Sequence, residues 1–163
     1  MQASTKEKIL SILETVTDPE VPVLTVIDMG IIRDVKEQDG NVEIMITPTY
    51  SGCPAMDVIN VNIRIALATI GFKNVKITQV LSPAWTTDWM GEAGKQKLKN
   101  YGIAPPTPKQ QVCNDKLFAE EAIQCPHCNS WHTHRVSEFG STACKALYVC
   151  DDCKEPFDYF KCH

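Results

Sequence analysis

Two Cys-x-x-Cys pairs near the carboxyl end constrain this chain more than any other feature of its sequence. The pairs join Cys125 with Cys128 and Cys150 with Cys153, and 21 residues separate them. Two residues between paired cysteines let both thiolates face one point, and two such pairs complete the tetrahedral sulfur shell of a structural zinc ion. The spacing therefore predicts a zinc ribbon. A redox motif, a disulfide staple or an iron–sulfur cluster are the alternatives for such pairs.

The length and apolar content fit one domain followed by a small module. The chain has 163 residues, of which 44% are apolar, enough for a packed core. No apolar run approaches the roughly 20 residues of a membrane helix, and the polar amino terminus lacks the apolar segment of a secretory signal. We therefore expect a cytoplasmic protein that does not bind membranes. In that reducing compartment, eight cysteines favour metal ligands or working thiols over disulfides.

The charge of the chain argues against nucleic acid as a partner. The net charge is −4, and residues 120–163 hold four basic and seven acidic side chains. Four thiolates around a divalent ion make this region more negative still. Proteins that bind nucleic acid need a basic surface that displaces counterions from phosphates. A zinc-ribbon nucleic-acid binder is therefore disfavoured.

Residues 1–103 predict a small two-layer α+β domain of sheet and helices. Hydrophobic periodicity and turn residues predict its elements in the order helix, strand, strand, helix, strand and helical stretch, over residues 4–16, 31–37, 42–47, 54–70, 74–81 and 82–101. Prolines then predict a linker over residues 104–119. The zinc ribbon should occupy residues 120–163, with strands at 133–138 and 146–150.

The helix predicted over residues 54–70 has two apolar stripes. One contains Ile59 and Ile63, and the other contains Val58, Val61 and Ile65. One stripe should pack on the sheet. The second should either meet the first helix or remain for a partner protein.

Cys53 stands where this helix should begin. Pro54 suits the first position of a helix, which places Cys53 at the N-cap. Unpaired amides and the positive end of the helix dipole would favour a thiolate there, as in a nucleophile or a soft-metal ligand. The alternative is that Cys53 is a small buried apolar residue, as most free cysteines are.

Two tryptophans and several spare donors complete the candidate residues. Trp85 and Trp89 are four residues apart and should share a helix face, where they either cap the core or contact a partner. Cys144 and Cys162 lie outside the pairs and could help receive a soft metal or simply fill space, whereas Cys113 has no visible role. The histidines of the ribbon are expected at the surface, namely His127, His132 and His134.

Three stretches of the first 90 residues resemble a known assembly domain. They are Asp18-Pro19-Glu20 with Pro22, Asp28-x-Gly30-Ile31, and Thr47 through Cys53-Pro54. They resemble the iron–sulfur assembly domain of SufT and of eukaryotic cytosolic iron–sulfur targeting factors. Residues 139–148 and 155–162 are similar to the PaaD (PaaJ) family of the phenylacetyl-CoA epoxidase system. That second resemblance spans nearly the whole chain.

The resemblance implies a place in aerobic phenylacetate catabolism. In that system the catalytic subunits carry a di-iron site, and a separate reductase carries flavin and a [2Fe–2S] cluster. The cysteine matching Cys53 is the one thought to be reactive, and the matched stretches make Asp28 and Thr49 candidates for handling a cluster with it. This chain lacks Glu-x-x-His pairs and a dinucleotide-binding glycine loop. We therefore expect an accessory protein and no catalyst.

The first functional hypothesis is a maturation factor that assists cluster assembly or delivery to the reductase subunit. Zinc would be structural, and iron or an iron–sulfur cluster would be transient cargo; the oxygenase subunits are further candidate partners. The alternative is a non-catalytic structural or coupling subunit that bridges oxygenase and reductase. A thiol oxidoreductase remains a third hypothesis, which tightly bound zinc would exclude. The sequence leaves a homodimer open.

Overall fold

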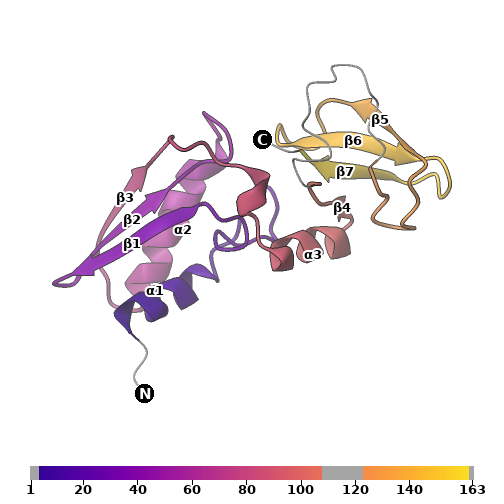
Figure 1. Cartoon of the computed structure of the whole chain (residues 1–163). Coiled ribbons are helices and arrows are strands. Elements are labelled where there is room, and N and C mark those ends of the chain that lie inside the picture. Colours follow the sequence, from indigo (N-terminus) through magenta and orange to yellow (C-terminus); the bar gives the residue numbers. More distant parts are fainter. Residues whose placement is uncertain (1–3, 108–122, 162–163) are drawn as a thin grey trace. The chain divides into compact units, whose positions relative to one another are not determined.

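The computed structural model describes residues 4–107 and 123–161, and the chain divides into two compact units of residues 1–91 and 92–163. Figure 1 shows a sheet with helices in the first unit and a second small sheet in the other. The predicted α+β fold with a ribbon is thus confirmed. None of the described helices is long and apolar enough to cross a membrane.

The first unit is a three-stranded sheet with helices along one face. Strand order is β1-β2-β3, with β1 antiparallel and β3 parallel to β2. The parallel pair needs a crossover connection, and α2 provides it (Figure 1). The elements are α1 Thr5–Leu13, β1 Ile32–Gln38, β2 Asn41–Ile46, α2 Ala55–Thr69, β3 Asn74–Gln79 and the short 3-10 helix η1 Thr87–Trp89.

Local sequence signals set the start of α1 and the β1–β2 turn. The Ser4 hydroxyl accepts from the Glu7 amide at 3.2 Å, and the Glu7 carboxylate accepts from the Ser4 amide at 2.7 Å. This capping box satisfies two amides that the helix leaves unpaired. Asp39 and Gly40 have φ of 52° and 78°, and two positive angles in succession give a turn whose twist matches that of the strands.

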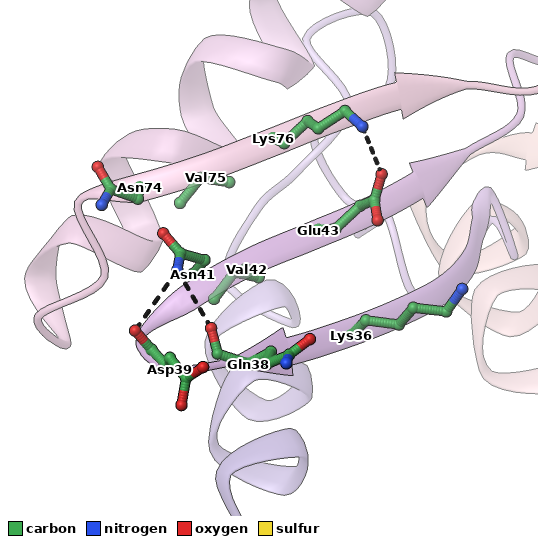
Figure 2. Close-up of a pocket in the computed structure, with 9 residues that line it drawn as sticks. All are labelled: Lys36, Gln38, Asp39, Asn41, Val42, Glu43, Asn74, Val75 and Lys76. Atoms are coloured by element: carbon green, nitrogen blue, oxygen red, sulfur yellow. Dashed lines mark hydrogen bonds and ion pairs between the residues drawn. The ribbon is translucent and has the colours of Figure 1, made fainter.

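The two faces of this sheet differ in polarity. Val42, Ile44 and Ile46 are buried under the helices, as the alternation of β2 predicts. On the open face, Glu43 is paired in register with Lys36 on one side and Lys76 on the other. The Lys76 ammonium lies 2.9 Å from the Glu43 carboxylate, and a dashed line marks this ion pair in Figure 2. That hydrogen-bonded ammonium lowers the pKa of Glu43, so two of the charged groups that line the hollow of Figure 2 neutralise each other.

The second apolar stripe of α2 is uncovered. Ile59, Ile63 and Leu67 are buried against the sheet. Val58, Val61 and Ile65 are exposed, however. The second stripe therefore does not pack against α1. It remains exposed, which was the other alternative given for it.

The prediction that Trp85 and Trp89 share one helix face is wrong. Trp85 precedes η1, is 3% exposed, and donates from Nε1 to the Met29 carbonyl at 2.9 Å. Trp89 ends η1, and the Arg33 guanidinium lies 3.6 Å from its ring centroid. Since Trp85 is in the core, it is not available for the expected partner contact. Trp89 is half-buried and keeps that prediction open.

The described residues of the second unit form one helix and a four-stranded sheet. Strand order is β4-β7-β6-β5, with β4 parallel to β7 and the other pairs antiparallel. Tyr148 stacks on Phe157 and meets Tyr159 edge-on in a core too small to hold without support. The elements are α3 Glu92–Tyr101, β4 Ile103–Ala104, β5 Thr133–Ser137, β6 Lys145–Cys150 and β7 Pro156–Phe160.

The division between the units differs from the boundary expected at residues 103 and 104. Ile103 and Ala104 pair with Asp158 and Tyr159 of β7, and Ala104 joins the ribbon core. α3 and β4 therefore belong to the ribbon unit, and the chain divides after Gly91. Residues 108–119 of the expected linker lie outside the described residues.

Substituting Gly30 by alanine tests the packing between the loop before β1 and the segment around η1. Gly30 has φ of 67°, and an added Cβ would clash with the Trp89 carbonyl. We expect a loss of about 2–4 kcal/mol in unfolding free energy, measured by urea unfolding followed through tryptophan fluorescence.

Gly40→Ala is the matched control, because φ is 78° there and no atom lies within 4 Å of an added Cβ. It should cost only the strain of the left-handed backbone, about 1–2 kcal/mol. Equal losses in the two variants would show that the close contact at Trp89 does not matter.

Candidate functional site

The two Cys-x-x-Cys pairs fold into the same local turn. The Asn129 amide donates to the Cys125 carbonyl at 2.9 Å, and the Lys154 amide donates to the Cys150 carbonyl at 3.0 Å. Asn129 and Lys154 both have positive φ, 62° and 63°. Each turn thus reverses the chain just after its second cysteine and directs both thiols to one side.

The four sulfurs converge as a metal-binding quartet. Their Sγ atoms all lie within 4.8 Å of one another, with 3.8 Å between Cys125 and Cys153 and 3.5 Å between Cys128 and Cys150. A tetrahedral zinc ion with Zn–S bonds of about 2.3 Å requires sulfurs about 3.8 Å apart. The donor set and its dimensions therefore fit zinc. Among the described residues, no other group of three or more ligands comes together.

The quartet cannot ionise fully without a cation. The Cys153 amide, helped by the Asp152 amide, lowers the pKa of Cys150 to about 7 against the effect of removal from water. The Glu155 amide lowers the pKa of Cys153 in the same way. Desolvation and hydrogen bonds to the other three thiols outweigh it and raise the pKa of Cys153 to about 12. Four thiolates in one place thus require a positive ion at their centre.

Carboxylates of the second turn tie the quartet to β5. The Asp152 carboxylate accepts from the Ser130 hydroxyl and lies 3.2 Å from His132 Nδ1, while Asp151 lies 3.1 Å from His134 Nδ1. The Asp151 amide also donates to the His132 carbonyl at 2.7 Å. The histidines therefore orient the turn from outside, and His132 is exposed as expected.

The additional thiols do not join the quartet in the described structure. Cys144 is buried just before β6, six residues from Cys150 along an extended strand, which is about 20 Å at 3.3 Å per residue. Its sulfur contacts the Thr142 hydroxyl at 3.0 Å. Cys113 and Cys162 lie outside the described residues, and their roles stay open.

Cys53 belongs to the first unit, in the loop before α2. The chain turns at Gly52, which has φ of 79°, and the Cys53 amide donates to the Tyr50 carbonyl at 3.3 Å. The N-cap is Pro54, so the expected capping position of Cys53 is wrong by one residue. The Ala55 amide nevertheless reaches the Cys53 sulfur.

Of the two alternatives for Cys53, the thiolate with a lowered pKa is not the one that the structure favours. Burial raises the pKa of its thiol above the usual value, and the carboxylates of Glu20 and Asp18 act in the same direction. The Ala55 amide and the Tyr50 hydroxyl lower the pKa, but by less. Desolvation therefore outweighs the helix start, and Cys53 is a protonated, half-buried thiol at neutral pH.

The candidate partners of Cys53 are largely built into the fold. The Asp28 carboxylate accepts a hydrogen bond from the Thr25 amide at 3.0 Å. In return, the Thr25 hydroxyl accepts one from the Asp28 amide, also at 3.0 Å. Thr49 is buried at 8% exposure in the loop that leads to Cys53. The groups with a direct effect on the thiol are Asp18, Glu20 and Tyr50, which the sequence did not single out as site residues. The sequence segments that contain these residues were recognised by their resemblance to the assembly domain. That the residues lie near the thiol depends on the tertiary fold.

Comparison with family models also assigns the two parts of the chain to different families. Residues 6–78 match a model described as an iron–sulfur cluster assembly protein. Residues 109–161 match the PaaD zinc beta ribbon domain. Cys53 falls in the first match and the quartet in the second.

Curated relatives resemble the whole chain or its first unit. The chain is 50% identical to a putative 1,2-phenylacetyl-CoA epoxidase subunit of Escherichia coli K12, across 95% of this chain and 92% of that protein. It is 40% identical to an Fe-S protein maturation auxiliary factor of Porphyromonas gingivalis, across 58% of this chain and 90% of that protein.

Solved structures confirm the fold of the first part. A conserved hypothetical protein of Thermotoga maritima has a TM-score of 0.51 and 30% identity, over 60% of this chain and 97% of its own. A DUF59 domain of Bacillus anthracis has a TM-score of 0.52 and 28% identity, over 56% of this chain and 88% of its own.

Replacement of single cysteines tests the metal centre. We expect one zinc ion per chain by elemental analysis, and loss of zinc in Cys128→Ser, because three thiolates leave the shell incomplete. Cys144→Ser is the control and should keep its zinc, since Cys144 lies outside the quartet. Retention of full zinc in Cys128→Ser would contradict the assignment.

Alkylation across pH tests the state of Cys53. Because burial raises its pKa, the rate should reach half its maximum at a higher pH than that of a free cysteine. Peptide mapping by mass spectrometry after iodoacetamide isolates this thiol from the others. A midpoint below that of free cysteine would mean that the helix start outweighs burial after all.

Proposed function

Since the chain belongs to the PaaD family, together with its Escherichia coli relative of the 1,2-phenylacetyl-CoA epoxidase, we propose that it is an accessory maturation factor of this epoxidase system. It assists the assembly of an iron–sulfur cluster or its delivery to the reductase subunit. The observation that carries the proposal is a half-buried Cys53, separate from the quartet, inside the region that matches the cluster-assembly model. The relatives named as maturation auxiliary factors support it.

Ligand exchange at Cys53 accounts for loading and release. When iron binds, an Fe–S bond forms, the S–H bond breaks, and the proton leaves to solvent. When a client thiolate replaces Cys53 on the iron, that bond breaks and the Cys53 sulfur regains a proton. No electron is transferred in either step. A thiol with a raised pKa holds the cargo weakly at neutral pH, because the metal must displace a proton, and weak binding favours release to a client.

The loop around Cys53 positions the sulfur and supplies proton acceptors. Gly52 turns the chain so that the thiol stands before α2, and the Tyr50 hydroxyl lies within hydrogen-bonding reach of it. The carboxylates of Asp18 and Glu20 are near enough to act on the thiol. These two carboxylates can accept the proton that leaves the Cys53 thiol and pass it to solvent.

The quartet has a different task in this proposal. Its four thiolates hold zinc, which supplies cohesion to a ribbon with a small core. A closed sulfur shell leaves no open position for cargo or catalysis. The ribbon unit then offers a folded surface for docking on the reductase, and the oxygenase subunits are further candidate partners. The cytoplasm, where such a system would work, is part of the same proposal.

A second function is favoured by the name of the Escherichia coli relative, which describes it as part of the epoxidase. In that case the protein would be a non-catalytic structural or coupling subunit between oxygenase and reductase. Such a role requires the protein during turnover by mature subunits, whereas a maturation factor is needed only beforehand. Omitting it from an assay of cluster-loaded subunits separates the two.

Anaerobic reconstitution of the apo reductase tests the proposal directly. The wild-type protein should accelerate cluster formation, followed by the visible absorbance of the reductase, and Cys53→Ser should not, because serine provides no soft thiolate ligand. Cys144→Ser is the matched control and should act as the wild type does. Equal acceleration by wild type and Cys53→Ser would overturn the role of Cys53.

A further inference from the structure

One face of α2 carries an apolar stripe that the first unit leaves in water. Val58, Val61 and Ile65 are 46%, 54% and 59% exposed, and Ala68 continues the row. Their spacing of three, four and three residues is that of a and d positions in a helical seam. Single exposed apolar residues are ordinary, but a contiguous row on one helix indicates a surface that binds another protein.

Charges beside the stripe are arranged in a self-complementary way. Asp57 and Arg64 are seven residues apart and exposed, so they lie on the same flank of the stripe, at successive g positions. The opposite flank carries the neutral residues Asn62 and Thr69, at e positions. One flank is therefore charged with both signs, and the other is uncharged.

This pattern distinguishes between the ways in which two such helices can pair. In a parallel pair, g positions face e positions, so each charge would meet neutral Asn62 or Thr69. In an antiparallel pair related by a two-fold axis, g faces g. Asp57 of each copy then meets Arg64 of the other, which gives two ion pairs. In that register Val58 packs against Val61 of the second copy.

We infer that the occupant of this face is a second copy of the chain, bound through antiparallel α2 helices. The two-fold axis makes each contact occur twice, as in most homodimers. Arg64 already donates to the Val75 carbonyl, but a guanidinium has five N–H donors and can serve both partners. The stripe is short compared with the roughly 800 Å² that each partner of a stable dimer buries, so the dimer is weak and reversible.

Sedimentation of the zinc-loaded full chain, from about 10 μM to about 1 mM, tests the inference in the range of weak association. The wild type should shift from monomer to dimer. Val61→Glu should stay monomeric, because it places a carboxylate of each copy against Val58 of the other in the apolar seam. Leu81→Glu is the matched control, since Leu81 is 62% exposed but lies outside α2, and it should dimerise as the wild type does.

Charge reversal gives the sharper test. Asp57→Arg and Arg64→Asp should each weaken the dimer about tenfold or more, because like charges then face each other twice. An equimolar mixture of the two variants should recover wild-type association, since both contacts in the mixed dimer again join opposite charges. A folding defect in either variant cannot produce that recovery, and circular dichroism of each variant checks for one.

Three results would overturn the inference. The wild type could remain monomeric at every concentration, or the mixture could associate no better than the single variants. In the third result, Val61→Glu leaves the mass distribution unchanged but abolishes co-elution with the reductase. The face would then belong to the client.

Discussion

Four sulfurs that converge on one point are the constraint on which the second unit depends. The two turns bring Cys125, Cys128, Cys150 and Cys153 within 4.8 Å of one another, where negative charge cannot accumulate without a cation. A cation there would offset this repulsion and link the turn before β5 to the turn between β6 and β7, in a unit whose apolar core is small. A zinc ion held there would have a closed sulfur shell, which would give the unit its shape and leave no open position for reactivity.

Cys53 shows how two effects compete at one sulfur. The start of α2 offers an amide that favours the thiolate, and burial with two nearby carboxylates favours the thiol. Burial prevails, so Cys53 is protonated and half-buried rather than an activated nucleophile. A sulfur of this kind suits reversible binding of a soft metal more than attack on a substrate.

Features with a local cause could be predicted from the sequence. The capping box at Ser4, the turn at Asp39 and the metal-binding quartet all depend on residues close in sequence or on a known spacing. The buried position of Trp85, the pairing of β4 with β7 and the direction of the Cys53 pKa shift depend on distant residues. Periodicity does not contain that information.

X-ray absorption of one anaerobically iron-loaded sample, at the zinc and iron edges, tests this division between sulfurs most directly. We predict zinc with four sulfurs at about 2.3 Å in both wild type and Cys53→Ser, and an iron signal in the wild type that Cys53→Ser lacks. The account would be contradicted if the zinc spectrum changed in Cys53→Ser. It would also be contradicted if Cys53→Ser bound as much iron as the wild type.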